Sequence, residues 1–504
     1  MANTPRALDT LKMRLAEVQD LEAASAVLGW DQMTYMPAGG GAARARQLAT
    51  LGSIAHERAS DPEIGRLLDS LSAYEASLPY DSDESSLIRV ARRDYERRIR
   101  VPAEFMAAFY SHSAQTYEVW ARARQANDFA AVQPYLERTL DLSRQLSAHF
   151  PGYDHVADPL IDFSDYGMKA ATVRRVFADL REALVPLAQA ILSREPADNS
   201  CIRLAYPIHL QQAFLTDVVG DLGFDYSRGR QDLSPHPFTT SFSVGDVRFT
   251  VRYKANDLGE ALFSAIHEAG HAMYEQGVTK EYDGGPLASG TSSGVHESQS
   301  RLWENIVGRS WEFWTHYYPK LRALFPEQLG TVDLEAFYRA INKVERSLIR
   351  TDADEVTYNL HVMLRFDFEL ALLEGSLAVR DLPEAWRERF RSDLGIVPPD
   401  DRDGVLQDVH WYGGMIGGAF QGYTLGNILS AQFYKAALVA HPEIPDQISR
   451  GEFGILHGWL GDAIYRYGRK YTAPELVERV TGEPLHIAPY IAYLHTKYNK
   501  LYGV

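Results

Sequence analysis

A helical spacing of apolar residues along almost the whole chain most constrains the fold. Near the start, Leu8, Leu11, Leu15 and Val18 recur at intervals of three and four, which places them on one face of a helix. No internal repeat or charged run marks a linker, so we expect one mainly α-helical domain over residues 1–504. The spacing recurs roughly over residues 41–60, 84–127, 129–149, 169–193, 206–223, 295–318, 333–375, 383–394, 424–441, 452–468 and 487–501.

One stretch departs from this helical spacing. Residues 238–253 read FTTSFSVGDVRFTVRY, in which β-branched and aromatic residues alternate with others on both sides of Gly245-Asp246. Two such runs joined at a Gly-Asp pair are typical of a β-hairpin, with Asp246 as a turn residue. The sequence therefore predicts a small β element within a helical body.

The pattern HExxH follows the hairpin at residues 267–271. On a helix, His267 and His271 lie on one face, so both imidazoles can reach one ion. Glu268, between them, can take a proton from a metal-bound water molecule. With 16 histidines and 67 acidic residues in 504, about 0.07 such patterns are expected by chance. The pattern indicates a zinc site, but it needs support from its surroundings.

The surroundings favour a helix. Asp257 with Glu260 three residues later is typical of a capping box, and Gly277 fits the position that follows a helix end. The residues between, 258–276, contain no proline. We expect the pattern to lie on this helix, with the hairpin beside it.

A catalytic zinc ion also needs a third protein ligand and an open position for water. Metzincins would have Gly at 274 and His at 277, whereas this chain has Tyr274 and Gly277, which excludes that class. Glu275 lies about 12 Å from His267 along one helix, too far to share an ion.

The third ligand is therefore expected from another segment. A Gly- and Ser-rich connection over residues 284–294 precedes a second helical pattern, which can return over the first helix. The spacing favours Glu297 as the third ligand and Glu304 as the second candidate. His296 is a further possibility that would give a different class of site.

Composition narrows the possible functions. The net charge of −16 argues against a general nucleic-acid binder. Cys201 is the only cysteine, so no disulfide forms within the chain. No run of 18 apolar residues predicts a membrane span, and the N-terminus lacks the apolar stretch of a secretory signal. We expect a cytoplasmic protein.

Further motifs accompany the metal-binding pattern over nearly the whole chain. In order, they are WDQMTYMPAGG at 30–40, HPF at 236–238, DVRFT at 246–250, HESQ at 296–299, IRTDAD at 349–354 and GVLQDVHW at 404–411. Together with HExxH, these motifs resemble the carboxypeptidase Taq family of metallocarboxypeptidases.

The resemblance implies a large helical, saddle-shaped body with a deep cleft, similar to neurolysin and angiotensin-converting enzyme. It implies a homodimer that removes single residues from peptide C-termini with broad specificity. His267, His271 and Glu297 would hold one zinc ion per chain, for which cobalt could substitute, and Glu268 would be the general base. The metal-binding core would occupy about residues 230–430.

An enzyme of this kind must recognise a free carboxylate, which a guanidinium binds in a bidentate fashion. Arg350 is the first candidate, and its alternative is a helical pair with Asp354 four residues on. Arg248 in the hairpin is the second candidate, and its alternative is a cross-strand salt bridge.

His410 and Tyr423 are candidates for hydrogen bonding to the developing oxyanion or to the substrate backbone. Their alternatives are a packed or capping histidine and a core tyrosine. The glycine-dense segment between them, 413–422, favours the functional interpretation because glycine lets a backbone lie close to a ligand.

Two other functions remain open from the sequence. A dipeptidyl carboxypeptidase or oligoendopeptidase could use the same zinc site. A peptide-binding scaffold with a closed structural metal would need no general base, so the glutamate of HExxH argues against it.

Overall fold

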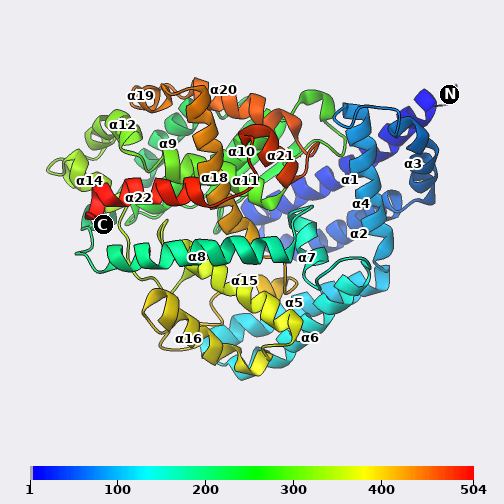
Figure 1. Cartoon of the computed structure of the whole chain (residues 1–504), viewed down its shortest axis with the longest axis horizontal. Helices are drawn as coiled ribbons and strands as arrows, with labels where there is room; N and C mark the ends of the chain where they lie inside the picture. The colour runs from blue at the N-terminus through cyan, green and yellow to red at the C-terminus, as the bar shows by residue number, and fades with distance from the viewer. Residues whose placement is uncertain (1–3) are drawn as a thin grey trace.

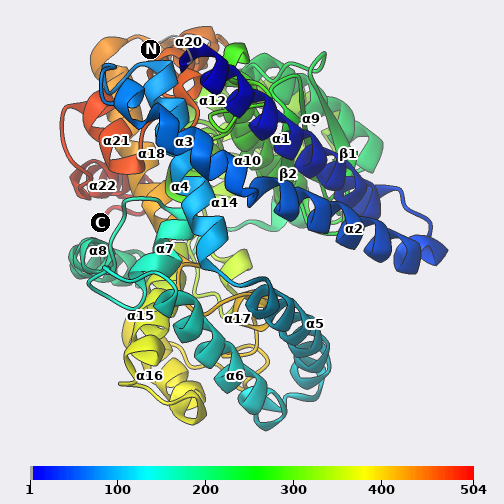
Figure 2. The same cartoon turned by 90° about the vertical axis from the view of Figure 1, so that its right-hand side faces the viewer.

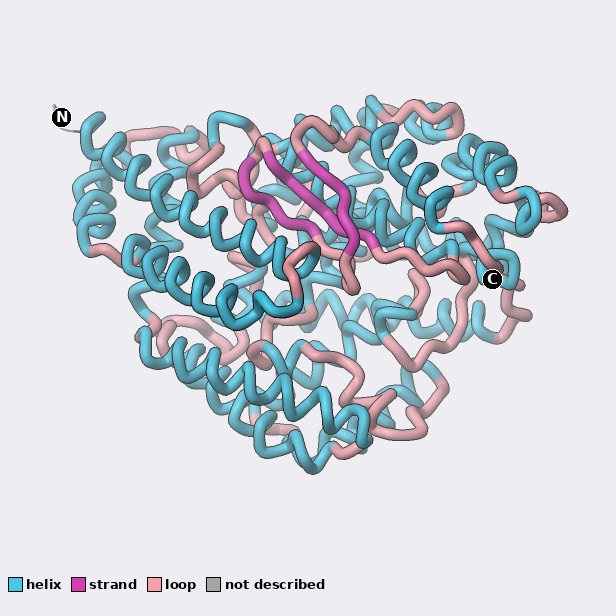
Figure 3. The backbone as a smooth tube through the Cα atoms, turned by 180° about the vertical axis from the view of Figure 1, so that it is seen from behind, coloured by secondary structure: helices cyan, strands magenta, loops and turns pink. Residues whose placement is uncertain are grey.

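The computed structural model describes residues 4–504. Figure 1 shows a body built largely of helices, and Figure 3, seen from behind, shows one small sheet near that side. The expectation of a mainly α-helical body with a small β element is therefore confirmed. The helices before the sheet are α1 (Thr4–Thr34), α2 (Gly41–Ala59), α3 (Pro62–Glu75), α4 (Asp83–Arg100), α5 (Ala103–Ala126), α6 (Phe129–Ala148), α7 (Asp158–Ser164), α8 (Ala170–Leu192) and α9 (Ile208–Leu222).

The sheet has three strands in the order β1-β3-β2. β2 (Thr239–Ser243) and β3 (Asp246–Val251) form the predicted antiparallel hairpin. β1 (Gly229–Leu233) pairs with β3 in parallel, and the sequence analysis missed it. Its sequence, GRQDL, lacks β-branched residues, and a parallel pair needs no tight turn that could mark it.

The helices after the sheet form the rest of the body. The first of them, α10 (Leu258–Gly277), carries the HExxH pattern and contacts both β2 and β3. The others are α11 (Ser293–Arg301), α12 (Trp311–Leu324), α13 (Pro326–Leu329), α14 (Leu334–Ile341), α15 (Tyr358–Glu374), α16 (Leu382–Leu394), α17 (His410–Gly413), α18 (Gln421–Ala440), α19 (Ile444–Ile448), α20 (Gly454–Ala463), α21 (Ala473–Thr481) and α22 (Ala488–Tyr502).

Several segments predicted as single helices are divided. Residues 84–127 form α4 and α5 because Pro102 drives Val101 into an extended conformation, with φ −98° and ψ 117°. Residues 295–318 form α11 and α12 with a π-helical turn, Leu302–Val307, between them. All six residues of the turn are buried, so tertiary packing sets the local geometry here.

The connection between α14 and α15 rules out the alternative interpretation of Arg350 as one member of a helical pair. Arg350 lies in a 3₁₀ turn, Arg350–Asp352, and not in a continuous helix over residues 333–375. A helical pair between Arg350 and Asp354 is therefore wrong. The Asp354 carboxylate instead accepts hydrogen bonds from the backbone of Glu345 and Thr357.

The apolar core has two large parts that meet at α18. One part surrounds α10 and the sheet, and it includes Phe433 of α18. The other surrounds α8 and α15, and it includes Leu425 and Ile428 of the same helix. α18 also packs along α11, the helix that carries Glu297. One helix therefore connects both parts of the core to this candidate ligand.

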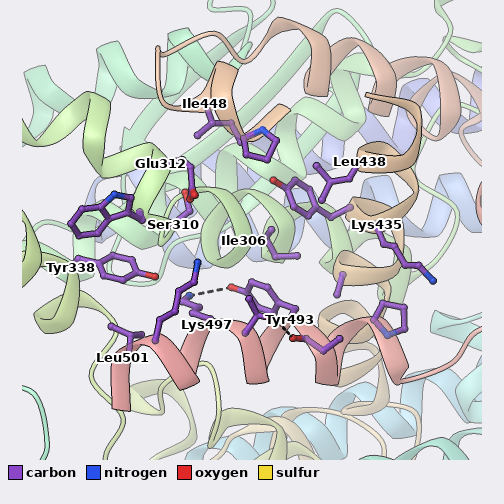
Figure 4. Close-up of a pocket in the computed structure, with 18 of the residues that line it drawn as sticks. Ile306, Ser310, Glu312, Tyr338, Lys435, Leu438, Ile448, Tyr493, Lys497 and Leu501 are labelled. Atoms are coloured by element: carbon purple, nitrogen blue, oxygen red, sulfur yellow. Dashed lines mark hydrogen bonds between the residues drawn. The ribbon is translucent and has the colours of Figure 1, made fainter. Parts of the chain in front are cut away.

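A cavity of about 690 Å³ opens between α12, α14, α18 and α22 (Figure 4). Glu312, Tyr338 and Lys497 are among its lining residues, and Lys497 donates a hydrogen bond to Tyr493 there. None of the predicted site residues lines this cavity, so it is separate from the candidate active site.

Candidate active site

The helix α10 begins at the N-cap that the sequence predicts, but without the full capping box, and it ends for a different reason than predicted. Asp257 is the N-cap, and its carboxylate accepts a hydrogen bond from the Glu260 amide at 3.3 Å. The Glu260 side chain pairs with Arg252 and with Lys254 rather than completing a capping box. Gly277 is the last helical residue, and a Cβ there would lie 2.5 Å from Cβ of Tyr465. Close packing, not a left-handed helix end, requires this glycine.

His267, His271 and Glu297 come together at one point. Each offers a ligand atom, and these atoms lie within 4.8 Å of one another. The Glu297 Oε2 atom lies 3.7 Å from His267 Nε2 and 3.3 Å from His271 Nε2. Two imidazole nitrogens and one carboxylate oxygen fit the donor set of a catalytic zinc site, which keeps a fourth position for water.

Two glycines allow Glu297 to reach the histidines. A Cβ at Gly270, inside the HExxH pattern, would lie 2.6 Å from the Ser300 Cα of α11. A Cβ at Gly426 of α18 would collide with the Glu297 side chain. The helix α11 is therefore held closely between α10 and α18. This packing brings Glu297 next to His271, although the two are 26 residues apart in the sequence.

The electrostatics of the cluster suit a cation. Burial opposes ionisation of Glu297, but Arg301 and His267 outweigh it and hold the pKa of Glu297 well below its usual range. Burial lowers the pKa of His271 to about 4, so this ring is neutral near pH 7, as a metal ligand must be. Burial has the same tendency at His267, but Glu297 and Glu304 outweigh it and raise the pKa of that ring.

The other ligand candidates lie behind the histidine rings. Glu304, on the π-helical turn, places Oε2 2.9 Å from Nδ1 of His267. His296 places Nδ1 2.6 Å from Nδ1 of His271. Both therefore face the side of each imidazole opposite the Nε2 atoms that meet Glu297. Glu275 contacts His296 at 2.7 Å.

Glu268 lines a cavity of about 620 Å³ together with His271 and Glu297. The Glu268 side chain is buried, and burial raises the pKa of its carboxyl group. The Thr239 hydroxyl of β2 donates a hydrogen bond to Glu268 Oε2 at 2.6 Å. The sequence analysis missed Thr239, although its prediction of a β element beside the site is in agreement with this contact.

Arg350 is buried against acceptors of its own chain. Its Nη2 atom lies 2.8 Å from Asp408 Oδ1, and its Nη1 atom donates to the Tyr358 hydroxyl at 3.0 Å. Asp408 also accepts from Nε of Arg365 at 2.5 Å. Burial opposes ionisation of Asp408, but the two guanidinium groups hold its pKa well below the usual range. Asp408 and Arg365 were not among the predicted site residues, although Asp408 lies within the GVLQDVHW motif.

His410 and Tyr423 belong to the same cluster. The Tyr423 hydroxyl lies 3.2 Å from His410 Nε2, and the Arg350 guanidinium carbon lies 5.2 Å from the centroid of the Tyr423 ring. On the other edge of the ring, His410 Nδ1 is 3.6 Å from Asp408 Oδ1. The structure therefore gathers three of the predicted residues around one carboxylate.

The glycine-dense segment between His410 and Tyr423 has a structural reason as well. Gly417 and Gly418 adopt positive φ angles of 107° and 76°, and a Cβ at Gly418 would collide with the Leu160 backbone. This segment, His410 and residues of α2, α4 and α5 line a second cavity of about 1310 Å³. In Figure 2, α2 lies above α5 and α6 on the same side of the body.

The two cavities adjoin, since Phe163 and Ser164 line both of them. The wide cavity is mostly apolar, whereas the smaller one is lined by Glu268 and by two of the three candidate ligands, His271 and Glu297. Arg248 lines neither cavity: on β3, its guanidinium pairs with Asp246 at 2.6 Å. That pair joins residues of one strand, so the predicted cross-strand salt bridge is not the contact that forms.

Comparisons with known proteins agree with this geometry. The family model "Carboxypeptidase Taq (M32) metallopeptidase" matches residues 10–498. Thermostable carboxypeptidase 1 of Thermus thermophilus is 40% identical, and Carboxypeptidase 1 of Bacillus subtilis is 34% identical, each over 97% of both chains. The crystal structure of the M32 carboxypeptidase from Deinococcus radiodurans R1 is 50% identical, with a TM-score of 0.97 over 99% of this chain and 100% of that one.

These findings confirm the resemblance inferred from the motifs and the prediction of an enzyme, and they argue against the alternative of a non-catalytic scaffold. They favour a carboxypeptidase over a dipeptidyl carboxypeptidase or an oligoendopeptidase. Within residues 4–504, no helix is long and apolar enough to cross a membrane. The chain belongs to the carboxypeptidase Taq (M32) family and is a metallocarboxypeptidase that acts on peptides with the help of a metal ion.

Proposed function

We propose that this carboxypeptidase removes single residues from free peptide C-termini with broad specificity, using one zinc ion held by His267, His271 and Glu297. The observation that carries the proposal is the meeting of these three donors beside the cavity that Glu268 lines. When bound, the ion supplies Lewis acidity, which polarises the scissile carbonyl and makes a water molecule more acidic. Cobalt, which accepts the same ligands, is the expected substitute.

Glu268 is proposed as the general base. Its carboxylate takes a proton from the attacking water and returns it to the leaving amine. Burial favours the protonated form of Glu268, which makes the carboxylate a stronger base than an exposed glutamate. The hydrogen bond from Thr239 fixes the position of Oε2, so the base faces the cavity in one orientation.

Arg350 is proposed to bind the substrate carboxylate. Two guanidinium groups, those of Arg350 and Arg365, share the single carboxylate of Asp408, so this cluster keeps one positive charge. Among residues 4–504, Nη1 of Arg350 donates to the neutral Tyr358 hydroxyl alone, and a substrate carboxylate can replace that hydroxyl with a stronger, charge-assisted bond. Arg248 is the second candidate for this role.

His410 and Tyr423 are proposed to donate hydrogen bonds to the oxyanion or to the substrate backbone. Their contact, 3.2 Å between His410 Nε2 and the Tyr423 hydroxyl, and the Arg350 guanidinium beside the Tyr423 ring support a shared role in holding the substrate. The apolar cavity beside His410 suits a peptide chain of varied sequence.

Mass spectrometry of N-blocked peptides tests this proposal. Peptides with free C-termini should yield a ladder of products that differ by single residues, whereas amidated peptides should stay intact. A chelator should stop the reaction, and added Zn²⁺ or Co²⁺ should restore it. Release of dipeptides, or cleavage of amidated peptides, would favour a dipeptidyl carboxypeptidase or an oligoendopeptidase instead.

The family resemblance further supports a homodimer that acts on peptides in the cytoplasm, and we include both in the proposal. Light scattering at several protein concentrations tests the assembly: a mass of twice 56.6 kDa supports the dimer, and a mass of one chain contradicts it.

A further inference from the structure

A line of hydrogen-bonding side chains extends from His271 away from the metal-binding point. His271 Nδ1 lies 2.6 Å from Nδ1 of His296. On the opposite edge of its ring, His296 Nε2 lies 2.7 Å from Glu275 Oε1. Both nitrogens of His296 therefore have partners, and neither is directed at Glu297.

The chemistry of the line fixes where each proton lies. Nε2 of His271 faces Glu297 at 3.3 Å, so this atom must be free of hydrogen to bind a metal ion. The hydrogen of the His271 ring then lies on its Nδ1 atom and is donated to His296 Nδ1, which accepts it through its lone pair. His296 consequently carries its hydrogen on Nε2 and donates it to Glu275. This placement of the two ring hydrogens gives each of the hydrogen-bonding nitrogens a partner and leaves both imidazole rings neutral.

The surroundings hold this line in place. The Gly290 amide donates to Glu275 Oε1 at 2.9 Å, and the Tyr274 ring packs against His296 with centroids 5.1 Å apart. A Cβ at Gly290 would lie 2.5 Å from Cδ2 of His296 and 2.8 Å from the Tyr274 ring. The loop before α11 therefore packs closely against one edge of the His296 ring, while the ring also lines the cavity beside Glu268.

The two histidines of HExxH are supported differently. His267 has a carboxylate, Glu304, directly behind its Nδ1 atom at 2.9 Å. His271 has no carboxylate in that position, because His296 stands between it and Glu275. Outer partners of this kind fix the tautomer and the orientation of a ligand, and losing one typically weakens metal binding by about 10–100-fold.

We propose that His296, backed by Glu275, is a positioning residue that fixes the tautomer and orientation of His271 for metal binding. This inference rests on the metal site proposed above. In this role His296 acts through His271, from which it accepts one hydrogen bond, and not as a ligand of the ion.

Three substitutions at residue 296 separate this role from simple packing. Asn places its side-chain oxygen at the same number of bonds from Cβ as Nδ1 of His, so His296→Asn keeps the acceptor for His271. His296→Gln places its terminal group where Nε2 lies, which keeps the contact with Glu275 and loses the acceptor. His296→Phe keeps the ring and loses both hydrogen bonds.

The measured quantity is the rate at which Zn²⁺ leaves the full-length protein for an excess of chelator, together with the Zn²⁺ affinity from competition with the same chelator. We expect His296→Gln and His296→Phe to bind Zn²⁺ about 10–100-fold more weakly, and His296→Asn to stay within about threefold of the unmodified protein. The absorption spectrum of the Co²⁺ form should change in the first two variants only. Thermal unfolding of the metal-free forms serves as the control for folding.

Each result decides the inference. Equal metal affinity in all four proteins, or losses that follow side-chain size with Phe the best tolerated, would overturn it. If a variant at residue 296 does not fold, Glu275→Ala replaces it. Weaker Zn²⁺ binding in Glu275→Ala would support the proposed role of His296 and Glu275, and unchanged binding would refute it. The proposed metal site is tested apart from this by Glu297→Ala: if that change leaves Zn²⁺ binding intact, the ligand assignment itself is wrong.

Discussion

Glu369 should make the stability of this protein depend on pH near neutrality. Its side chain is fully buried in α15, and Oε1 accepts a hydrogen bond from Trp411 Nε1 at 3.0 Å, next to His410. Oε2 has no partner among the described residues. Burial raises the pKa of Glu369 to about 7, although the bond from Trp411 and the nearby backbone amides of Gly417 and Ala419 oppose this rise.

The sign and size of the effect follow from linkage. The folded protein binds this proton more tightly than the unfolded chain, so the contribution of Glu369 is fully present below pH 4.5 and is lost as pH rises to about 7. At 1.36 kcal/mol for each pKa unit, the rise from 4.5 to about 7 corresponds to about 3 kcal/mol. Glu369→Gln removes the buried charge, keeps an acceptor for Trp411, and should recover this amount above pH 8.

Calorimetric unfolding from pH 5 to pH 9 measures the effect. With an unfolding entropy near 2.1 cal/mol/K per residue, 504 residues give about 1 kcal/mol/K. Glu369→Gln should therefore raise Tm by about 3 °C at pH 9 relative to the unmodified protein and change it little at pH 5. A difference in Tm that is the same at both pH values would refute the reasoning, because a charge-independent packing change would produce it.

Further predictions concern the site itself. Glu268→Gln should keep its metal, measured by elemental analysis, and lose at least about 10³ in kcat, since a general base supplies about 10²–10⁴; near-normal kcat would exclude Glu268 as the base. Asp408→Asn leaves two buried guanidinium groups unpaired and should lower the free energy of unfolding in urea by about 3–5 kcal/mol. Asp246→Asn, at a partly exposed pair, should lower it by less than about 1 kcal/mol. Equal losses in the two variants would contradict the difference in burial. Gly270→Ala should weaken Zn²⁺ binding and lower Tm because a Cβ there would lie 2.6 Å from the α11 backbone. Gly259→Ala on the same helix, where the nearest atom would be 3.5 Å away, should retain both, because alanine favours a helix more than glycine does. A matching loss there would show that close packing against α11 is not the cause.

Local patterns in the sequence predicted the mainly helical fold and indicated the pentapeptide as a candidate metal site. Residues 267–271 carry their own spacing, and the alternation over 238–253 is a local signal, so both predictions needed no tertiary information. The resemblance carried by the motifs then indicated Glu297, which spacing alone had only ranked first. A break between helices can also be predicted from the sequence where a proline causes it, as Pro102 does between α4 and α5.

Contacts between distant segments were beyond the sequence analysis. Asp408 joins Arg350 and Arg365 across more than 40 residues. It lies within the GVLQDVHW motif, but the motif does not show which distant side chains it contacts. Gly270 and Gly426 were not recognised, because the need for a missing side chain appears only when α11 lies between α10 and α18. The same limit explains why Glu304 could be ranked as a ligand although it supports His267 from behind.

Anomalous diffraction at the zinc absorption edge, from crystals of the zinc-loaded protein, tests the central claim most directly. The account predicts one strong peak per chain, about 2.0–2.2 Å from His267 Nε2, His271 Nε2 and one Glu297 carboxylate oxygen, with Glu304 and His296 behind the two rings. A peak bound by His296 or Glu304, or a zinc ion held away from α10, would contradict the account.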